Sequence, residues 1–373
     1  MQRPNYRRFD SVLFVTTLTL ILIGGVMIYS SYDVPLSSNE SLLKSAAARQ
    51  MFVAAGGIAL SMLLAFIDYH VFISAYRWLY LFSLTLLAFT LIAGHTSFGA
   101  QSWLGPEAIR LQPSELSKVL MIVVLARFLG QSPEALESAK PFLLSALLVA
   151  PPVILIYLQP DLGTALILFV TWVGMDFLAG VRWRHMALLA GAGLAGAPFI
   201  WFKLKGYMRE RILTFLFPGQ DPSGMSYNIN QALISIGSGG LWGKGLLHGT
   251  QSQLYFLRVR HTDFIFSVLA EELGFVGAIL LLALFALLIM RLIHIALSAP
   301  DAYGRLVVAG VATMLVIQIF INLGMNANLL PVTGLPLPLV SYGGSSLLAT
   351  LVGLGLAQSV ALRRKGPESE SLL

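Results

Sequence analysis

The 373-residue sequence contains no cysteine, so disulfide bonds are excluded, although this absence neither assigns nor excludes a compartment. The six histidines are scattered and cannot combine with cysteine into a zinc-type ligand cluster. Charged residues make up only 11%, whereas a soluble domain carries about 25%. With 57% hydrophobic residues and a mean hydropathy of +0.78, the composition excludes an ordinary soluble domain and predicts a polytopic membrane protein.

Long apolar stretches predict an all-α integral membrane protein built as one bundle over residues 1–373. A membrane span needs roughly 20 apolar residues. Ten stretches fit: about 10–32, 46–67, 71–94, 113–130, 141–159, 162–180, 186–203, 264–291, 305–325 and 342–362. The first follows Arg3, Arg7 and Arg8, as in a signal peptide, but it has no clear small-residue cleavage site and is predicted to be retained.

The distribution of Lys and Arg predicts the orientation. Thirteen of the 24 lie in segments on the side of the N-terminus, four lie in the short loops opposite, and seven lie in or next to the long segment 204–263. We therefore expect both termini in the cytoplasm, a long extracytoplasmic loop at 204–263 before the eighth span, and a short polar cytoplasmic tail at 364–373. This bias accounts for much of the net charge of +6, so no nucleic-acid partner is invoked.

Asp263 stands where the eighth span begins, at the edge of hydrocarbon. It suits a helix cap and it also suits a catalytic base, and the two roles are compatible. Glu271 and Glu272 follow about two turns deeper, roughly 80° and 180° around the helix from Asp263. They cannot both face one cavity with Asp263, and we expect at least one of them to pair with a neighbouring helix and fix the packing.

Two further polar sites are predicted on the same outer side. Glu115 and Lys118 share one helix face, as an ion pair within the helix or as a charged cavity wall. Asp161 follows Pro160 at the start of the next helix, where it suits a cap. With Asp263, these acids lie at one membrane depth, and a shared polar cavity is the economical interpretation.

Cations are predicted on that side too, namely Arg49, Lys118, Arg209, Arg211 and Lys244. Arg and Lys at an outer cavity suit a phosphate or pyrophosphate. The glycine-rich run 235–245 lacks the GxxxxGK[ST] spacing, so nucleotide binding is not indicated, and a flexible or re-entrant loop is favoured over a phosphate cradle. The proline-rich stretch from residue 330 predicts irregular backbone that is buried in protein or faces water.

Several motifs occur in an order that resembles the SEDS family (shape, elongation, division and sporulation) over most of the chain. They are GAQSWLG, QPSELSK, QPDLGT, DPSGMSYNINQALISIGSGGLWGKG, GTQSQLYFL, RHTDFIFSVLAEELGFVG and LPVTGLPLPLVSYGGSS. The residues of the motifs GTQSQL and PLPLVSYGGSS are more similar to the RodA-like elongation branch than to the FtsW-like division branch.

This resemblance implies a peptidoglycan glycosyltransferase in the bacterial cytoplasmic (inner) membrane, with its active site on the extracytoplasmic face. RodA-like proteins polymerise lipid II into glycan strands, and undecaprenyl pyrophosphate leaves. The acid of the HTDF motif is essential in the family, and that position is Asp263, the implied general base. Arg49, Lys118, Arg211 and Lys244 are candidate cations for the pyrophosphate, with Glu115 and Asp161 as further substrate-binding candidates.

The resemblance also implies partners. These are a class B penicillin-binding protein, which is a transpeptidase, and other membrane proteins of the elongation machinery. No resident cofactor or protein metal site is implied, but departure of pyrophosphate needs positive charge, which a divalent cation such as Mg²⁺ or Mn²⁺ can supply.

Two departures and two alternatives stand beside this interpretation. The family usually has Leu-Pro-Glu where this chain has Leu257-Arg258-Val259, and Arg where it has Ser102. The alternatives are a flippase or other transporter of a lipid-linked precursor, and a non-catalytic scaffold for cell-wall enzymes. A flippase needs a polar route through both leaflets, whereas the acids and cations cluster on one side here, which favours an enzyme.

Overall fold

The computed structural model describes residues 8–33, 45–97, 100–105, 110–130, 138–204, 206–217, 225–254, 256–257 and 259–364. Its elements are α1 (Ser11–Ile28), the π-helical η2 (Tyr29–Asp33), α2 (Ala46–Phe66), α3 (Val71–Ala93), β1 (His95–Ser97), β2 (Ala100–Trp103), α4 (Pro113–Leu129), α5 (Ala139–Leu158), α6 (Leu162–Ala179), α7 (Trp183–Lys203), α8 (Gly206–Leu216), α9 (Met225–Ser238), α10 (Thr250–Gln253), α11 (Ile265–Leu297), α12 (Ala302–Asn326) and α13 (Gly344–Ala361).

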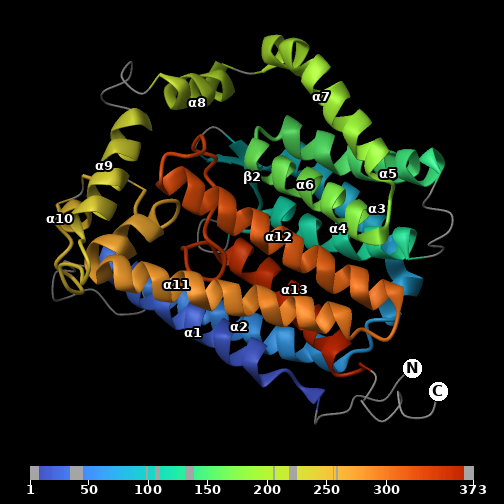
Figure 1. Cartoon of the computed structure of the whole chain (residues 1–373), viewed down its shortest axis with the longest axis horizontal. Helices are drawn as coiled ribbons and strands as arrows, with labels where there is room; N and C mark the ends of the chain where they lie inside the picture. Colours follow the sequence, from blue (N-terminus) through green and yellow to red (C-terminus); the bar gives the residue numbers. More distant parts are fainter. Residues whose placement is uncertain are drawn as a thin grey trace.

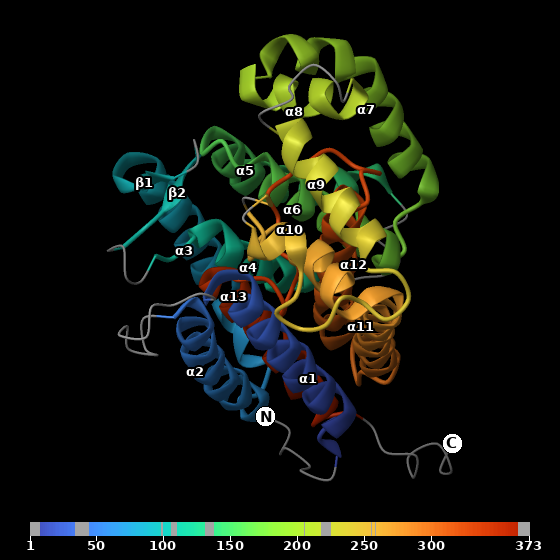
Figure 2. The ribbon, with the colours of Figure 1, turned by 90° about the vertical axis from the view of Figure 1, so that its left-hand side faces the viewer.

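Each of the ten predicted spans coincides with a helix. In the part of the chain that the structure describes, eight helices are long and apolar enough to cross a membrane. The other two are α4, which has 17 residues, and α7, whose His185 stacks on Phe142 of α5 and whose far end extends with α8 beyond the bundle (Figures 1 and 2). The protein is therefore a multi-pass helical membrane protein, as predicted, and the number ten stays a prediction.

Two predicted connections contain regular structure. The segment 204–263, expected as a long loop, carries α8, α9 and α10. The outer connection 95–112 begins with a small antiparallel hairpin in which β1 pairs with β2. The tail 364–373 lies outside the described residues, apart from Arg364.

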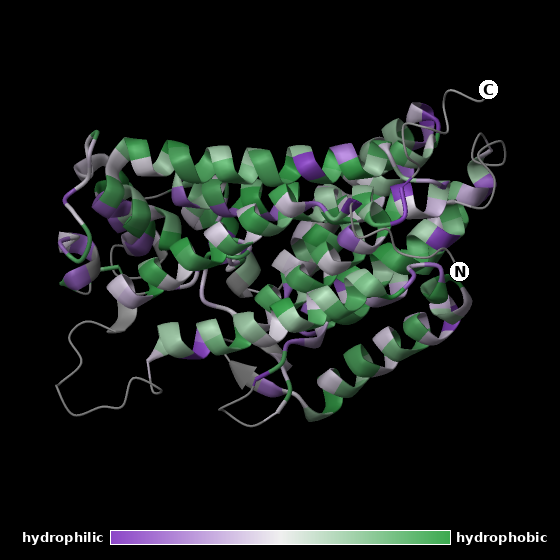
Figure 3. Cartoon of the chain, turned by 90° about the horizontal axis from the view of Figure 1, so that it is seen from below, coloured by the Kyte–Doolittle hydropathy of each residue, from purple (hydrophilic) through white to green (hydrophobic). Residues whose placement is uncertain are grey.

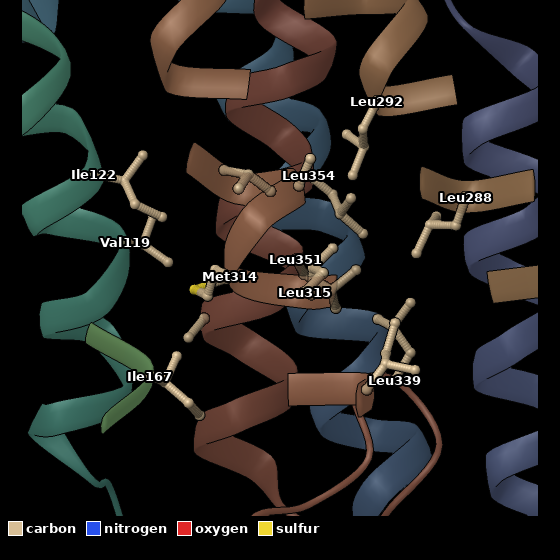
Figure 4. Packing of buried hydrophobic residues seen from close by; sticks show 14 of the residues in the cluster. Val119, Ile122, Ile167, Leu288, Leu292, Met314, Leu315, Leu339, Leu351 and Leu354 are labelled. Carbon is tan, nitrogen blue, oxygen red and sulfur yellow. The ribbon is translucent and has the colours of Figure 1, made fainter. Parts of the chain in front are cut away.

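The core lies around α12 and α13, which are apolar on all sides. A helix of this kind is stable only when other helices surround it. In the most apolar 18-residue window of each helix, 67% of the residues of α12 and 83% of those of α13 are buried. Their side chains interlock with those of α4, α6 and α11 (Figure 4), while the outward faces of the outer helices present apolar residues (Figure 3).

Small residues bring α2 and α13 close together. A Cβ atom on Gly355 would lie 2.7 Å from the carbonyl oxygen of Ser61, and one on Gly57 would lie 2.6 Å from a methyl carbon of Leu351. In a membrane, helices associate through van der Waals packing of this kind, because lipid supplies no hydrophobic driving force between them.

The bundle has two distinct ends. At the terminal end, formed by residues 8–10, 67–70, 298–302 and 362–364, both chain termini leave the bundle (Figure 1). Contacts between distant segments define it: the guanidinium of Arg8 bonds the carbonyl of Arg364, and the hydroxyl of Tyr69 bonds Asp301. The opposite end, called the distal end, contains residues 29–33, 259–264 and 331–343. This arrangement agrees with the prediction that both termini lie on one side.

Helix α11 is broken at Gly274, whose φ of 66° and ψ of −165° are not helical. A break in a membrane helix exposes backbone groups that need partners. The glycine-rich loop after α9 supplies them on one side of the break: Lys244 N donates to Glu271 O, and Gly245 N donates to Glu272 O, each at 3.0 Å.

The same loop serves the other side of the break. Phe275 N donates to Gly240 O at 2.9 Å, and Val276 N donates to Leu241 O at 3.2 Å. Such close approach requires glycine, because a Cβ on Gly243 would lie only 2.1 Å from a carbonyl oxygen of α11. The loop expected to be flexible or re-entrant is therefore bonded to α11, and its glycines have a structural role.

We predict that Gly243→Ala destabilises the protein by about 1–3 kcal/mol, since the new methyl group overlaps the α11 backbone and φ at this position is +78°. The check is the midpoint of thermal unfolding of the purified protein in detergent. Gly237→Ala is the matched control: it lies inside α9 with open space around its Cβ, so it should stabilise slightly. Equal midpoints for both variants would contradict the proposed close packing.

Candidate active site

Asp263 lies at the distal end, in the turn 259–264 that leads into α11. Of the two roles that suit this residue in the sequence, the helix cap is not the one found in the structure. Helix α11 starts at Ile265 with Phe264 at the cap position, and no side chain accepts a bond there. Asp263 stands one residue too early, so its carboxylate is not used by the first turn of the helix.

Two asparagines of α12 hold the backbone of Asp263. Asn322 Nδ2 donates to the Asp263 carbonyl at 3.1 Å, and Asn326 Nδ2 donates to the same oxygen at 2.9 Å. The amide oxygen of Asn326 in turn accepts from Ser267 Oγ at 2.6 Å. Both asparagines are fully buried. In that environment an unpaired amide is costly, so these bonds fix the position of the turn.

The irregular segment 331–343 holds the residues just before Asp263. Ser341 Oγ donates to Thr262 O at 2.5 Å, and Tyr342 N donates to His261 O at 2.9 Å. Gln50 of α2 fixes this segment by donating to Ser341 O at 3.1 Å. Most of this irregular backbone is thus enclosed in protein, one of the two environments expected from its prolines, while Gly334 is exposed.

The carboxylate of Asp263 emerges beside a gap left by Gly334. This exposed glycine has a φ of +75°, and a Cβ there would lie 3.8 Å from Asp263 Oδ2. No side chain at position 334 therefore covers the acid. The adjacent Thr333 accepts a bond at its carbonyl from Arg211 Nη1 at 3.0 Å. A carboxylate and a guanidinium thus lie close to adjacent residues, Gly334 and Thr333, of one short strip of this segment.

Desolvation raises the pKa of Asp263 to about 6. A hydrogen bond from Thr262 and the positive charge of Arg211 oppose this rise. Half-burial disfavours the charged form, because few water molecules can solvate it. A carboxyl group that titrates near neutral pH can both accept and release a proton under physiological conditions.

Asp161 caps α6, as expected. Its Oδ1 accepts from Thr164 N at 3.1 Å, while its Oδ2 accepts from Gln112 Nε2 at 2.8 Å and from Ser114 Oγ at 3.2 Å. The start of α6 also touches the strip beside Asp263, because a Cβ on Gly163 would lie 3.2 Å from Thr333 O. Asp161 thus belongs to the distal end but has structural partners of its own.

Of the two alternatives left open for Glu115 and Lys118, the structure shows the ion pair within α4. Lys118 Nζ lies 2.9 Å from Glu115 Oε1, and both side chains are almost fully buried, at 2% and 3% exposed. Burial of two charges is tolerated only when they neutralise each other.

The two acids of α11 have separate partners, as expected. Glu271 accepts from Lys244 Nζ at 2.8 Å and from Thr250 Oγ1 at 3.1 Å, while Glu272 accepts from Ser30 Oγ at 2.5 Å. These bonds tie η2, α10 and the glycine-rich loop to α11 near its break. The charge of Lys244 is therefore opposed locally by Glu271.

The remaining candidate cations differ in their surroundings. Arg49 is exposed on α2. Arg209 donates from Nε to the carbonyl of Trp201 at 2.9 Å and so ties α8 to α7. Among the predicted cations, Arg211 is the one whose charge acts on Asp263. In the described ranges, no group of three or more His, Asp and Glu residues is arranged to hold a metal ion.

Sequence reasoning missed the residues that position Asp263. The signal was present, because Asn322 and Asn326 are spaced i, i+4 in an apolar helix and so face the same direction. Buried amides in a membrane helix need partners. Which backbone carbonyl they bind could not be read from the sequence, since Asp263 precedes Asn322 by 59 positions.

Comparisons with known proteins identify the family of the chain. Residues 10–366 match the FtsW/RodA/SpoVE family model, described as "Cell cycle protein". The chain is 40% identical to peptidoglycan glycosyltransferase MrdB of Escherichia coli K12, with 97% of each chain covered. It is 38% identical to stage V sporulation protein E of Bacillus subtilis, with 94% of this chain and 96% of that protein covered.

Solved structures show the same fold. A chain in a peptidoglycan synthase complex, described as coordinating polymerization and crosslinking, superposes with a TM-score of 0.81 at 37% identity, with 95% of this chain and 97% of that chain covered. The rod shape determining protein RodA of Thermus thermophilus gives a TM-score of 0.71 at 34% identity, with 97% and 100% covered. The chain therefore belongs to the FtsW/RodA/SpoVE family.

Proposed function

We propose that this protein is a peptidoglycan glycosyltransferase that polymerises lipid II into glycan strands during cell elongation. The supporting observation is the half-buried carboxylate of Asp263, beside Arg211, on a backbone that α12 holds in place. Relatives named peptidoglycan glycosyltransferase, at 40% identity for MrdB and 36% for an FtsW of Geobacter metallireducens, support the reaction class. The higher sequence identity to MrdB and the residues of the motifs GTQSQL and PLPLVSYGGSS favour the elongation branch.

In the proposed reaction Asp263 is the general base. It accepts the proton from the 4-hydroxyl of the acceptor sugar, and that oxygen forms a bond to the anomeric carbon of the donor. The bond from this carbon to the pyrophosphate oxygen breaks, and undecaprenyl pyrophosphate leaves with the electron pair. This single displacement inverts the α-linked donor to a β-linked product and needs no second carboxylate as a nucleophile.

Arg211 is our first candidate to stabilise the leaving pyrophosphate, because its charge already acts at Asp263. Arg49 is the second, since it is exposed on α2. Lys118 and Lys244 are paired with Glu115 and Glu271. A role for them in binding requires that substrate shares or replaces these acids. Glu115 and Asp161 also remain candidate substrate-binding residues, on the condition that substrate shares or replaces their present partners.

A divalent cation, Mg²⁺ or Mn²⁺, remains part of the proposal. The described residues offer no cluster of three His, Asp or Glu side chains for it. The pyrophosphate oxygens of the substrate would therefore supply most of its ligands, as is common for Mg²⁺. When bound, it would neutralise charge on the leaving group.

The proposed location is the bacterial cytoplasmic membrane, with the distal end facing outward and both termini in the cytoplasm. The proposed partner is a class B penicillin-binding protein that crosslinks the new strands, beside other membrane proteins of the elongation machinery. The similarity to a chain in a peptidoglycan synthase complex supports a partner of this kind.

Asp263→Asn should abolish polymerisation, with less than about 1% of the wild-type rate. The amide keeps the size of the side chain, and the backbone clamp from α12 is unaffected, so the thermal midpoint should stay the same. The assay uses purified full-length protein, labelled lipid II, the transpeptidase partner and Mg²⁺ or Mn²⁺.

Glu210→Gln is the matched control, since Glu210 is an exposed acid next to Arg211, and its activity should be unchanged. Glycan chains from Asp263→Asn would overturn the role as base. If the wild type makes no polymer either, a translocation assay with lipid II in vesicles tests the flippase.

The polymerisation rate should rise with pH, reach half its maximum near pH 6 and level off about one pH unit higher, because only the ionised form of Asp263 accepts a proton and its pKa is raised to about 6. Arg211→Gln should shift this midpoint upward, since the positive charge of Arg211 lowers the pKa of Asp263. The measurement is kcat/KM between pH 5 and 8 for both proteins. A midpoint that does not move, or moves down, would contradict the proposed coupling.

A further inference from the structure

The strip 333–335 beside Asp263 is held at both of its ends. The carbonyl of Thr333 accepts from Arg211 Nη1 at 3.0 Å, and the carbonyl of Leu335 accepts from Asn322 Nδ2 at 2.8 Å. Asn322 also donates to the backbone carbonyl of Asp263 at 3.1 Å. One amide of α12 therefore fixes the strip relative to the turn that carries the acid.

The N–H groups of the strip are left without partners. Among the residues that the structure describes, no N–H group from position 332 to 335 donates a hydrogen bond, and the carbonyl of Gly334 accepts none. Later in the same irregular segment the N–H groups are paired, namely those of Leu337, Val340, Ser341, Tyr342 and Gly343. Backbone groups are strong donors and acceptors, so this contrast singles out 332–335 as the part able to bind a molecule from outside the chain.

Gly334 is the accessible residue of this run. It is exposed, whereas Val332 and Leu335 are buried. Its φ of +75° favours glycine, and the space where a Cβ would stand lies 3.8 Å from Asp263 Oδ2. A group that occupies this space contacts the carboxylate and lies directly beside the N–H and the C=O of Gly334.

A sugar with hydroxyl groups on two neighbouring carbons matches this arrangement. A hydroxyl both donates and accepts, so it can pair with the N–H of Gly334, with its C=O, or with both. The hydroxyl on the adjacent carbon can then donate to Asp263. The two hydroxyls thereby satisfy the free backbone groups and the carboxylate together.

We propose that the backbone of Gly334 binds the 3-hydroxyl of the acceptor sugar and so directs the neighbouring 4-hydroxyl to Asp263. The proposal rests on the proposed function, in which that 4-hydroxyl is the nucleophile. Gly334 is a substrate-binding residue that acts through its backbone, and the lack of a side chain gives the sugar access to the acid. Arg211 and Asn322 hold the strip that presents it.

The test compares lipid II with an analogue that lacks the 3-hydroxyl of its terminal sugar, each as acceptor. The donor is labelled lipid II without its own 4-hydroxyl, so that each labelled product reports one transfer. The full-length protein is used with its transpeptidase partner and Mg²⁺ or Mn²⁺. We expect wild-type transfer to the 3-deoxy acceptor to be about tenfold slower, because the backbone groups of Gly334 lose their partner.

Gly334→Ala places a methyl group in the space that the sugar needs. Transfer to lipid II should fall about a hundredfold, since a small displacement of the acceptor is enough for such a loss. Removal of the 3-hydroxyl should then cost less than about twofold more, because the contact is already broken.

Gly180→Ala is the matched control. Gly180 also has a positive φ, of +98°, with open space around its Cβ, and it caps α6 at the end opposite Asp161. Both variants should lower the thermal midpoint by similar amounts, since each forces alanine into a left-handed conformation. Gly180→Ala should keep the transfer rate and the tenfold discrimination between the two acceptors.

Two outcomes would overturn the proposal: equal transfer by the wild type to both acceptors, or the same tenfold loss in the wild type and in Gly334→Ala. If the wild type transfers to neither acceptor, the proposed function fails, and native mass spectrometry of Asp263→Asn with the two lipids tests the contact separately. A preference for lipid II that Gly334→Ala removes supports the contact at Gly334, whereas equal binding of both lipids overturns it.

Discussion

The site depends on the two hydrogen bonds that Asn322 and Asn326 donate to the backbone carbonyl of Asp263. In the low-dielectric interior of a membrane bundle, unpaired amides are costly, so these side chains hold their partner strongly. They bind the backbone rather than the carboxylate. The turn is thereby fixed to α12, a central helix of the core, while the acid itself keeps its capacity to accept a proton.

A second constraint follows from the break in α11. The glycine-rich loop after α9 satisfies the backbone groups on both sides of Gly274, and Lys244 in that loop binds Glu271. Because α11 begins two residues after Asp263, the loop, α11 and the acid form one continuous unit. The glycines and the lysine that suggested a phosphate cradle in the sequence are explained by packing and charge pairing, which also stabilise the distal end.

Polar residues are placed in this bundle in two ways. Glu115, Glu271 and Glu272 each have a specific partner, as buried groups in a membrane must. Asp263 differs, since it is half-buried, uncovered at Gly334, and influenced by Arg211 without a direct ion pair among the described contacts. A carboxyl group with a pKa near 6 in such a position can accept a proton, whereas the carboxylates of Glu115 and Glu271 are each paired with a lysine.

The sequence by itself determined the helices, because runs of about 20 apolar residues have few alternatives in a membrane, and its ordered motifs determined the family and singled out Asp263. It also indicated the Glu115–Lys118 pair and the Asp161 cap, which depend on local spacing. Only the tertiary structure decided that Asp263 is not a cap, that Asn322 and Asn326 clamp it, and that Lys244 faces Glu271. Those contacts join residues far apart in the chain, and the low-dielectric interior selects partners by proximity in three dimensions, which spacing along the sequence does not encode.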